Sequence, residues 1–124
     1  FEGLAYAIVD SLQGYPQGGE LYLTGGGAAS ATWLQIIADC TGRTVVSSTF
    51  NELSARGAAI LAARSVDALS RYPALEQTRY RPHPQAHSRY VALYPVYRLL
   101  REQMLPVWHA RREALQRISQ EQRI

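Results

Sequence analysis

Residues 20–48 place two short strand-forming runs around one helical run, and this arrangement constrains the fold more than any other feature. The first run, ELYLT at 20–24, alternates apolar and other side chains, and the second, TVVSS at 44–48, is rich in β-branched residues. Between them, Ser30 offers an N-cap and Gly42 a C-cap for a helix. A strand, a helix and a strand so close in sequence predict a parallel, right-handed βαβ unit.

The sequence TGGGA at residues 24–28 joins the first strand to this helix. A glycine triplet packs no side chain and costs backbone entropy, so it indicates either a turn with positive φ or the close approach of another group to the backbone. In a parallel unit the turn lies at the carboxyl edge of the sheet, where its amides and the helix N-terminus can meet an anion or a nucleotide. It matches neither the GxGxxG fingerprint nor the phosphate loop, which needs a Lys that this chain lacks.

Periodic apolar residues predict further helices on both sides of this unit. Asn51 is the expected N-cap of the helix after the second strand. Gly57 lies inside that helix and indicates either tight helix packing or the close approach of another backbone or a ligand. Pro95 is expected to kink the helix that contains it. The expected helices cover residues 1–13, 30–41, 51–66, 87–104 and 105–121, and residues 67–86 form a connector.

The composition indicates a globular, cytoplasmic protein. The chain is 47% hydrophobic and 19% charged, which is typical of a folded domain. No apolar run reaches the ~20 residues that a membrane-spanning helix needs, and the first residues do not show the charged-then-apolar pattern of a signal sequence. Cys40 is the single cysteine, so an internal disulfide is excluded. Phe1 already lies on a helical apolar stripe, and we therefore expect a piece of a longer polypeptide.

The basic residues are confined to the later part of the chain. Residues 1–42 carry four acids and no Arg, for a charge of −4, whereas thirteen Arg against six acids give residues 43–124 a charge of +7. This polarity fits either a nucleic-acid-binding face or helices with solvated rows of Arg. The Arg residues are spread out rather than clustered, which favours the second interpretation.

Few side chains suggest chemistry of their own. His83 and His87 have the i, i+4 spacing of a metal pair, but Pro84 lies between them and no further ligand completes a site. Cys40 falls on the apolar side of its helix and Ser30 is a cap, so neither indicates a catalytic nucleophile. The stripe of Tyr90, Leu93, Tyr94, Tyr97 and Leu100 indicates core or helix contact rather than base stacking.

Taken together, four segments resemble the C-terminal portion of the FGGY carbohydrate kinases, in the family's order and spacing. They are EGLAYAI at 2–8, LTGGGAASATWLQIIADCTGRTV at 23–45, ELSARGAAILAA at 52–63 and YVALYPVYRLL at 90–100. The resemblance implies an α/β fold: the C-terminal part of an actin-like (ribonuclease H-like) ATPase domain, helix-rich with a short parallel βαβ unit. Residues 1–66 would form its nucleotide-binding core segment, 67–86 a connector and 87–124 a C-terminal helical segment.

The resemblance also implies a role for the glycine turn. Such kinases transfer the γ-phosphoryl group of ATP to a sugar or polyol hydroxyl, here a pentulose-like one. The turn against the nucleotide corresponds to Gly25, Gly26 and Gly27, with Ala28 and Ala31 beside it. The family sometimes has an adenine-contacting Asn where this chain has Ala31. Arg56 is a second departure, since the family commonly has Leu there.

The family's catalytic Asp lies upstream of this region, so the resemblance implies no catalytic and no metal-binding residue here. Asp39 and Glu52 occupy structural positions of the family, and Mg²⁺ would be bound mainly by the missing part. We expect an isolated fragment without kinase activity, with ATP and a sugar as partners of the full protein and with neither nucleic acid nor membrane as a partner. Two strands are too few for a stable sheet, so self-association through exposed apolar surface is expected. The alternatives are a non-catalytic actin-like nucleotide-binding module and a basic helical nucleic-acid-binding domain.

Overall fold

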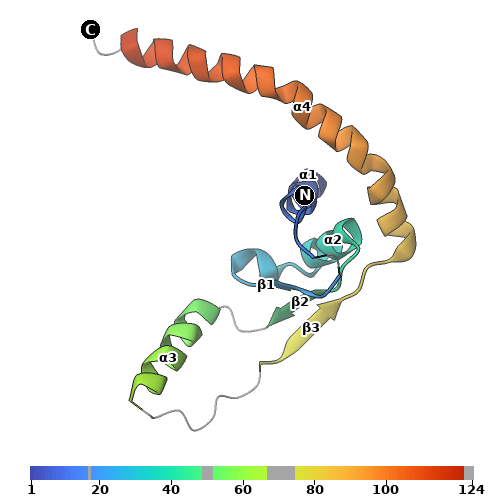
Figure 1. Cartoon of the computed structure of the whole chain (residues 1–124), viewed down its shortest axis with the longest axis vertical. Coiled ribbons are helices and arrows are strands. Elements are labelled where there is room, and N and C mark those ends of the chain that lie inside the picture. Colours follow the sequence, from blue (N-terminus) through green and yellow to red (C-terminus); the bar gives the residue numbers. More distant parts are fainter. Residues whose placement is uncertain (17, 49–51, 67–74, 122–124) are drawn as a thin grey trace. The chain divides into compact units, whose positions relative to one another are not determined.

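The computed structural model describes residues 1–16, 18–48, 52–66 and 75–121 (Figure 1). These residues form two compact units, Phe1–Tyr90 and Val91–Ile124. The elements in chain order are α1 (Glu2–Ser11), β1 (Leu21–Leu23), the 3₁₀ helix η1 (Gly26–Ala29), α2 (Ala31–Thr41), β2 (Val45–Ser48), α3 (Leu53–Ser65), β3 (Gln77–Tyr80) and α4 (Pro84–Glu121).

The sheet of the first unit has three strands in the order β1-β2-β3. β1 and β2 are parallel, with Leu21 beside Val45, which confirms the predicted parallel βαβ unit. β3 pairs antiparallel with β2, Val45 lying beside Tyr80. The prediction of a connector without a strand was wrong at β3, and the sheet therefore has one strand more than expected. Residues 67–74 of that connector lie outside the described residues.

The core lies between α2 and one face of the sheet, and α1 packs on α2 (Figure 1). Its centre is formed by Leu34, Ile37, Ala38 and Val45, with Ile8, Leu21, Leu23 and Tyr80 packed around it. Cys40 is buried, which agrees with its predicted place on the apolar side of the helix, and Ile37 is buried beside it, whereas Trp33 and Ile36 are only half-buried. The buried face of α2 also includes Leu34 and Ala38.

Both ends of α2 have the predicted caps. The Ser30 hydroxyl accepts a hydrogen bond from the Trp33 amide at 3.3 Å and so satisfies one of the first backbone donors. At the other end Gly42 is left-handed, with φ of 68°, and its amide donates to the Ala38 carbonyl. These caps fix the helix between the glycine turn and β2.

The later helices differ from the predicted ones in their bounds. α4 is one continuous helix through Pro95 and Pro106, not two helices meeting at residue 105 (Figure 1). Each proline removes one backbone donor, but the turns on either side keep theirs, so the helix continues. α3 follows Glu52, while Asn51 lies outside the described residues.

In the described chain no atom lies within 4 Å of a side-chain carbon built on Gly57, so the expected close approach is absent there. None of the described helices is both long and apolar enough to span a bilayer.

Candidate functional site

The glycine turn leaves β1 at the carboxyl edge of the two parallel strands. Gly25 has φ of 85° and ψ of −171°, a region that is essentially restricted to glycine. Its carbonyl accepts a hydrogen bond from the Ala28 amide at 2.9 Å, which opens the short helix η1. The sequence left open either a turn with positive φ or the close approach of another group to the backbone, and the structure has positive φ at Gly25.

The other two glycines of the turn have different surroundings. Gly26 is exposed, and a side-chain carbon built on it would meet nothing within 4 Å of the described chain. Gly27 is also exposed, and the same carbon would lie 3.8 Å from Nε1 of Trp33. Neither has positive φ, so only Gly25 needs glycine for the backbone conformation. The other two leave the surface of the turn open to an approaching group.

The backbone amides of the turn are also available to an approaching group. The backbone nitrogens of Gly26 and Gly27 donate no hydrogen bond to any residue that the structure describes. Both precede α2, whose N-terminus carries the positive end of the helix dipole. Successive unpaired amides before a helix form a concave surface that suits a negatively charged oxygen.

The predicted site residues Ala28 and Ala31 take two different roles. Ala28 is half-buried and packs against the core, and its carbonyl accepts a hydrogen bond from the Ser47 hydroxyl of β2 at 3.4 Å. Ala31 is exposed and is the first residue of α2. The five predicted residues lie within residues 25–31 and so belong to one continuous segment of the chain. Sequence reasoning missed Ser47, whose place near the carboxyl end of β2 was the available signal.

Trp33 lies beside this segment, one turn into α2. Its ring is half-buried and contacts the ring of Phe1, with centroids 5.6 Å apart and planes at 50°. Its indole nitrogen borders Gly27, so the turn has an aromatic wall on one side.

The two histidines both contact Asp39 at the start of α4. His83 donates its backbone amide to Oδ1 of Asp39 at 2.7 Å, and its ring Nδ1 lies 3.2 Å from the same oxygen. His87 Nδ1 lies 2.9 Å from the Asp39 carbonyl oxygen, and the Gln35 amide donates to Asp39 Oδ1 at 2.9 Å. Within the described chain no three His, Cys, Asp or Glu side chains gather into a metal site. Asp39, a tempting catalytic base, is thus a buried anchor for the start of α4.

Two tyrosines join α1 to the first turns of α4. The Tyr6 hydroxyl donates to the Tyr90 carbonyl at 3.1 Å, and the Tyr90 hydroxyl donates to Glu2 at 3.0 Å. Their rings meet edge to face with centroids 5.9 Å apart. Burial, followed by the hydrogen bond to Glu2, raises the pKa of Tyr90 to about 12. The predicted helix contact is confirmed at Tyr90, whereas Leu93 and Leu100 of the same stripe are exposed.

Cys40 lies close enough to Glu2 and Asp39 for their charges to affect its thiol. Burial, and then the charges of Glu2 and Asp39, raise the pKa of its thiol to about 11. A thiol with so high a pKa stays protonated at neutral pH and is a poor nucleophile.

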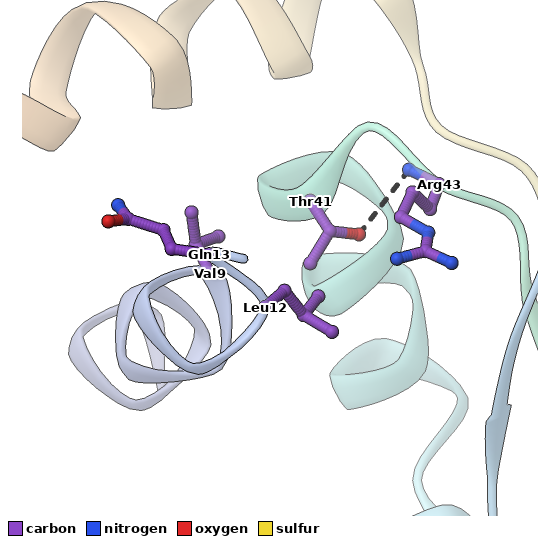
Figure 2. Close-up of a pocket in the computed structure, with 5 residues that line it drawn as sticks. All are labelled: Val9, Leu12, Gln13, Thr41 and Arg43. Atoms are coloured by element: carbon purple, nitrogen blue, oxygen red, sulfur yellow. Dashed lines mark hydrogen bonds between the residues drawn. The ribbon is translucent and has the colours of Figure 1, made fainter. Parts of the chain in front are cut away.

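A small pocket of about 230 Å³ opens at the opposite end of α2 from the glycine turn (Figure 2). Its lining residues are Val9, Leu12, Gln13, Thr41 and Arg43. Arg43 donates its Nε to the Gly19 carbonyl at 3.2 Å, and its amide donates to the Thr41 hydroxyl. The carboxyl ends of α1 and α2 both lie here, and their dipoles favour the guanidinium over an added anion. The Thr41 hydroxyl donates to the Ile37 carbonyl at 2.7 Å, and the lining residues include no acid, so the glycine turn remains the better candidate site.

Three comparisons with known proteins agree with one another. Residues 2–66 match the C-terminal domain of the FGGY family of carbohydrate kinases. A probable L-xylulose kinase from Pasteurella multocida (strain Pm70) is 30% identical over 105 residues, which cover 81% of this chain and 22% of that protein. A ligand-bound xylulose kinase and a gluconate kinase, both from Lactobacillus acidophilus, align with TM-scores of 0.72 and 0.71, each at 19% identity and over 83% of this chain and 23% of the other. The chain therefore spans less than a quarter of the length of these relatives.

Proposed function

Because the chain belongs to the FGGY family of carbohydrate kinases, whose C-terminal domain it matches over residues 2–66, we propose that it forms the ATP-binding part of a sugar kinase. The family resemblance seen in the sequence is confirmed, and the fold is the helix-rich C-terminal part of an actin-like ATPase domain with a small mixed sheet. In the full-length protein the γ-phosphoryl group of ATP would pass to a hydroxyl of a sugar or polyol.

The observation that carries this proposal is the geometry of the glycine turn. Gly25 holds a backbone conformation that other residues rarely adopt, and it aims the turn along the carboxyl edge of the sheet. The amides of Gly26 and Gly27, together with the N-terminus of α2, supply hydrogen-bond donors and positive potential for a phosphate oxygen. Ala28 and Ala31 would border the nucleotide, with no side chain long enough to obstruct it.

This chain's part in phosphoryl transfer is to bind and orient the nucleotide. The described residues do not gather the ligands of a metal site, so we propose that Mg²⁺ enters with ATP and is held mainly by other parts of the polypeptide. Asp39 is buried and its carboxylate accepts a hydrogen bond from the His83 amide, so we do not assign it the role of the base. The catalytic base would therefore also lie outside this chain, and the isolated chain would have no kinase activity.

The substrate would be a pentulose or a related polyol. The support is the 30% identity to a probable L-xylulose kinase and the shared fold with a xylulose kinase. The gluconate kinase with the same fold shows that related chains can serve another sugar class. The sugar-binding residues would lie mostly outside the present chain.

Ligand-induced thermal stabilisation tests the nucleotide site directly. We expect Mg-ATP to raise the melting temperature of the chain, because a ligand that binds only the folded state stabilises it. L-xylulose, D-xylulose and gluconate, each without nucleotide, are expected to leave that temperature unchanged. A shift with a sugar alone and none with Mg-ATP would contradict the proposed role.

Activity is tested in the full-length kinase. We expect ATP-dependent phosphorylation of a pentulose by the complete protein, and none above background by residues 1–124 alone. Phosphorylation by the isolated chain would show that a catalytic base is present in it, against the proposal.

A further inference from the structure

The side chain of Trp33 places an unused hydrogen-bond donor beside the glycine turn. A side-chain carbon built on Gly27 would lie 3.8 Å from Nε1 of the Trp33 indole. This nitrogen donates to no residue that the structure describes. Among the described residues no buried side-chain nitrogen lacks a partner, so Nε1 is open to a group that approaches the turn from outside.

The indole ring is held in place by packing. It lies against the core cluster of α2 and the sheet, and it contacts the ring of Phe1 with centroids 5.6 Å apart. The backbone of Trp33 is fixed as well, because its amide donates to the Ser30 hydroxyl of the helix cap at 3.3 Å. A donor that is already held in position loses little conformational freedom when a ligand binds to it.

The chemistry of the segment indicates which ligand group this donor would meet. Residues 21–38 carry no charged side chain. Within this segment a negative ligand group is therefore attracted by neutral donors, which are the amides of Gly26 and Gly27, the N-terminus of α2 and the Trp33 indole. A hydrogen bond to an ionised oxygen is roughly twice as strong as one between neutral groups. An N–H at this position thus favours a phosphate oxygen over a nitrogen of the base.

From this geometry we infer that the Trp33 indole N–H donates a hydrogen bond to a phosphate oxygen of the bound nucleotide, beside the amide of Gly27. The inference rests on the proposed nucleotide-binding role of the glycine turn and adds to it a side chain that contacts the phosphates rather than the base. Trp33 would be a binding residue, since the indole N–H neither accepts nor releases a proton in the reaction.

Replacement of Trp33 by benzothienylalanine tests the donor alone, because this residue has sulfur in place of the N–H and keeps the shape of the ring. The affinity for Mg-ATP should fall about tenfold, as expected for the loss of a hydrogen bond to a charged group. Trp33→Phe also removes the donor and should give a similar loss. The matched control is the same replacement at Trp108, the other tryptophan of the chain, which is 55% exposed in α4. It should leave the affinity unchanged.

Isothermal titration calorimetry with two probes identifies the part of the nucleotide that is contacted. Magnesium tripolyphosphate has the phosphate groups and no base, so the replacement at Trp33 should weaken its binding by the same factor as that of Mg-ATP. A loss with Mg-ATP but none with tripolyphosphate would overturn the contact to phosphate. Unchanged affinity for Mg-ATP, with thermal unfolding showing an intact fold, would overturn any role of the indole.

Gly25→Ala distinguishes failure of this inference from failure of the proposed function. If Gly25→Ala weakens Mg-ATP binding and the replacement at Trp33 does not, the turn keeps its role and only the indole contact is refuted. If neither change affects the affinity, or if the unsubstituted chain does not bind Mg-ATP, both the nucleotide role of the turn and the contact from Trp33 are refuted.

Discussion

The imidazole of His87 occupies the space that a side chain at Gly42 would need. A carbon built on Gly42 would lie 2.6 Å from Cε1 and 2.7 Å from Nε2 of His87. Gly42 also has φ of 68°, in the left-handed region. The C-cap of α2 and the first turns of α4 therefore favour glycine at this position for two independent reasons.

Gly42→Ala is expected to lower the free energy of unfolding by about 2 kcal/mol or more, because it adds left-handed strain to a steric conflict with His87. Urea unfolding followed by circular dichroism measures the change. Gly57→Ala is the matched control, since Gly57 lies inside α3 with no described neighbour within 4 Å of the added carbon. It should stabilise the chain by ~0.5–1 kcal/mol through helix propensity alone. Equal effects of the two substitutions would contradict this account of Gly42.

Gly25→Ala is expected to weaken Mg-ATP binding at least about tenfold, because alanine cannot hold the backbone angles of Gly25 without strain of 1–3 kcal/mol. Isothermal titration calorimetry gives the affinity. Gly26 has ordinary φ and open space around an added carbon, so Gly26→Ala should change the fold little. Any loss of affinity in this variant would come from the added methyl group obstructing the nucleotide. Unchanged affinity in both variants would argue against the turn as the nucleotide site.

Asp39→Ala is expected to cost about 2 kcal/mol of stability, since it removes a buried acceptor from the His83 amide and from Gln35. Thermal unfolding reports the loss. Glu20→Ala provides the comparison, because Glu20 accepts from Arg79 at 3.0 Å on the surface. That hydrogen bond is also the main reason why the pKa of Glu20 is lowered. Exposed pairs contribute little, so the melting temperature of this variant should stay near that of the wild type. A larger drop for Glu20→Ala than for Asp39→Ala would refute the anchoring role of Asp39.

Stability should fall at alkaline pH. Burial raises the pKa of Cys40 from 9.0 to about 11, so the folded state keeps a proton that the unfolded chain releases. The resulting stabilisation is complete below pH 9 and is lost as pH rises to about 11, with a size on the order of 1–2 kcal/mol. Urea unfolding across this range should show the decline. Cys40→Ala should flatten it, leaving the part due to Tyr6 and Tyr90, whose raised pKa values act above pH 10. An identical decline in the variant would exclude the thiol as its source.

The sequence was sufficient to predict the elements whose signals are local. Ser30 and Gly42 mark the ends of α2 because capping depends on the residue at the cap itself. The parallel pairing of β1 with β2 followed from the short helix between them. β3 was missed because Gln77–Tyr80 is polar and mostly exposed, and only its distant pairing with β2 makes it a strand. A single helix through Pro95 and Pro106 was missed because local rules end helices at proline.

The candidate site was predictable in position but not in detail. The glycine triplet predicted a turn, yet only the backbone angles distinguish the requirement at Gly25 from the open surface at Gly26. His83 and His87 carried the spacing of a metal pair, and nothing near them in sequence indicates that Asp39, more than 40 residues earlier, is their partner. Contacts between distant segments decide such roles.

Helix α2 has different tasks at its two ends. Its first residues extend the glycine turn, and its last turn, through Asp39, holds the start of α4. Eleven residues of capped helix form a stiff rod of roughly 16 Å. The glycine turn and the His83 contact are therefore joined by one rigid element, so a displacement at one end of α2 would be transmitted to the other end.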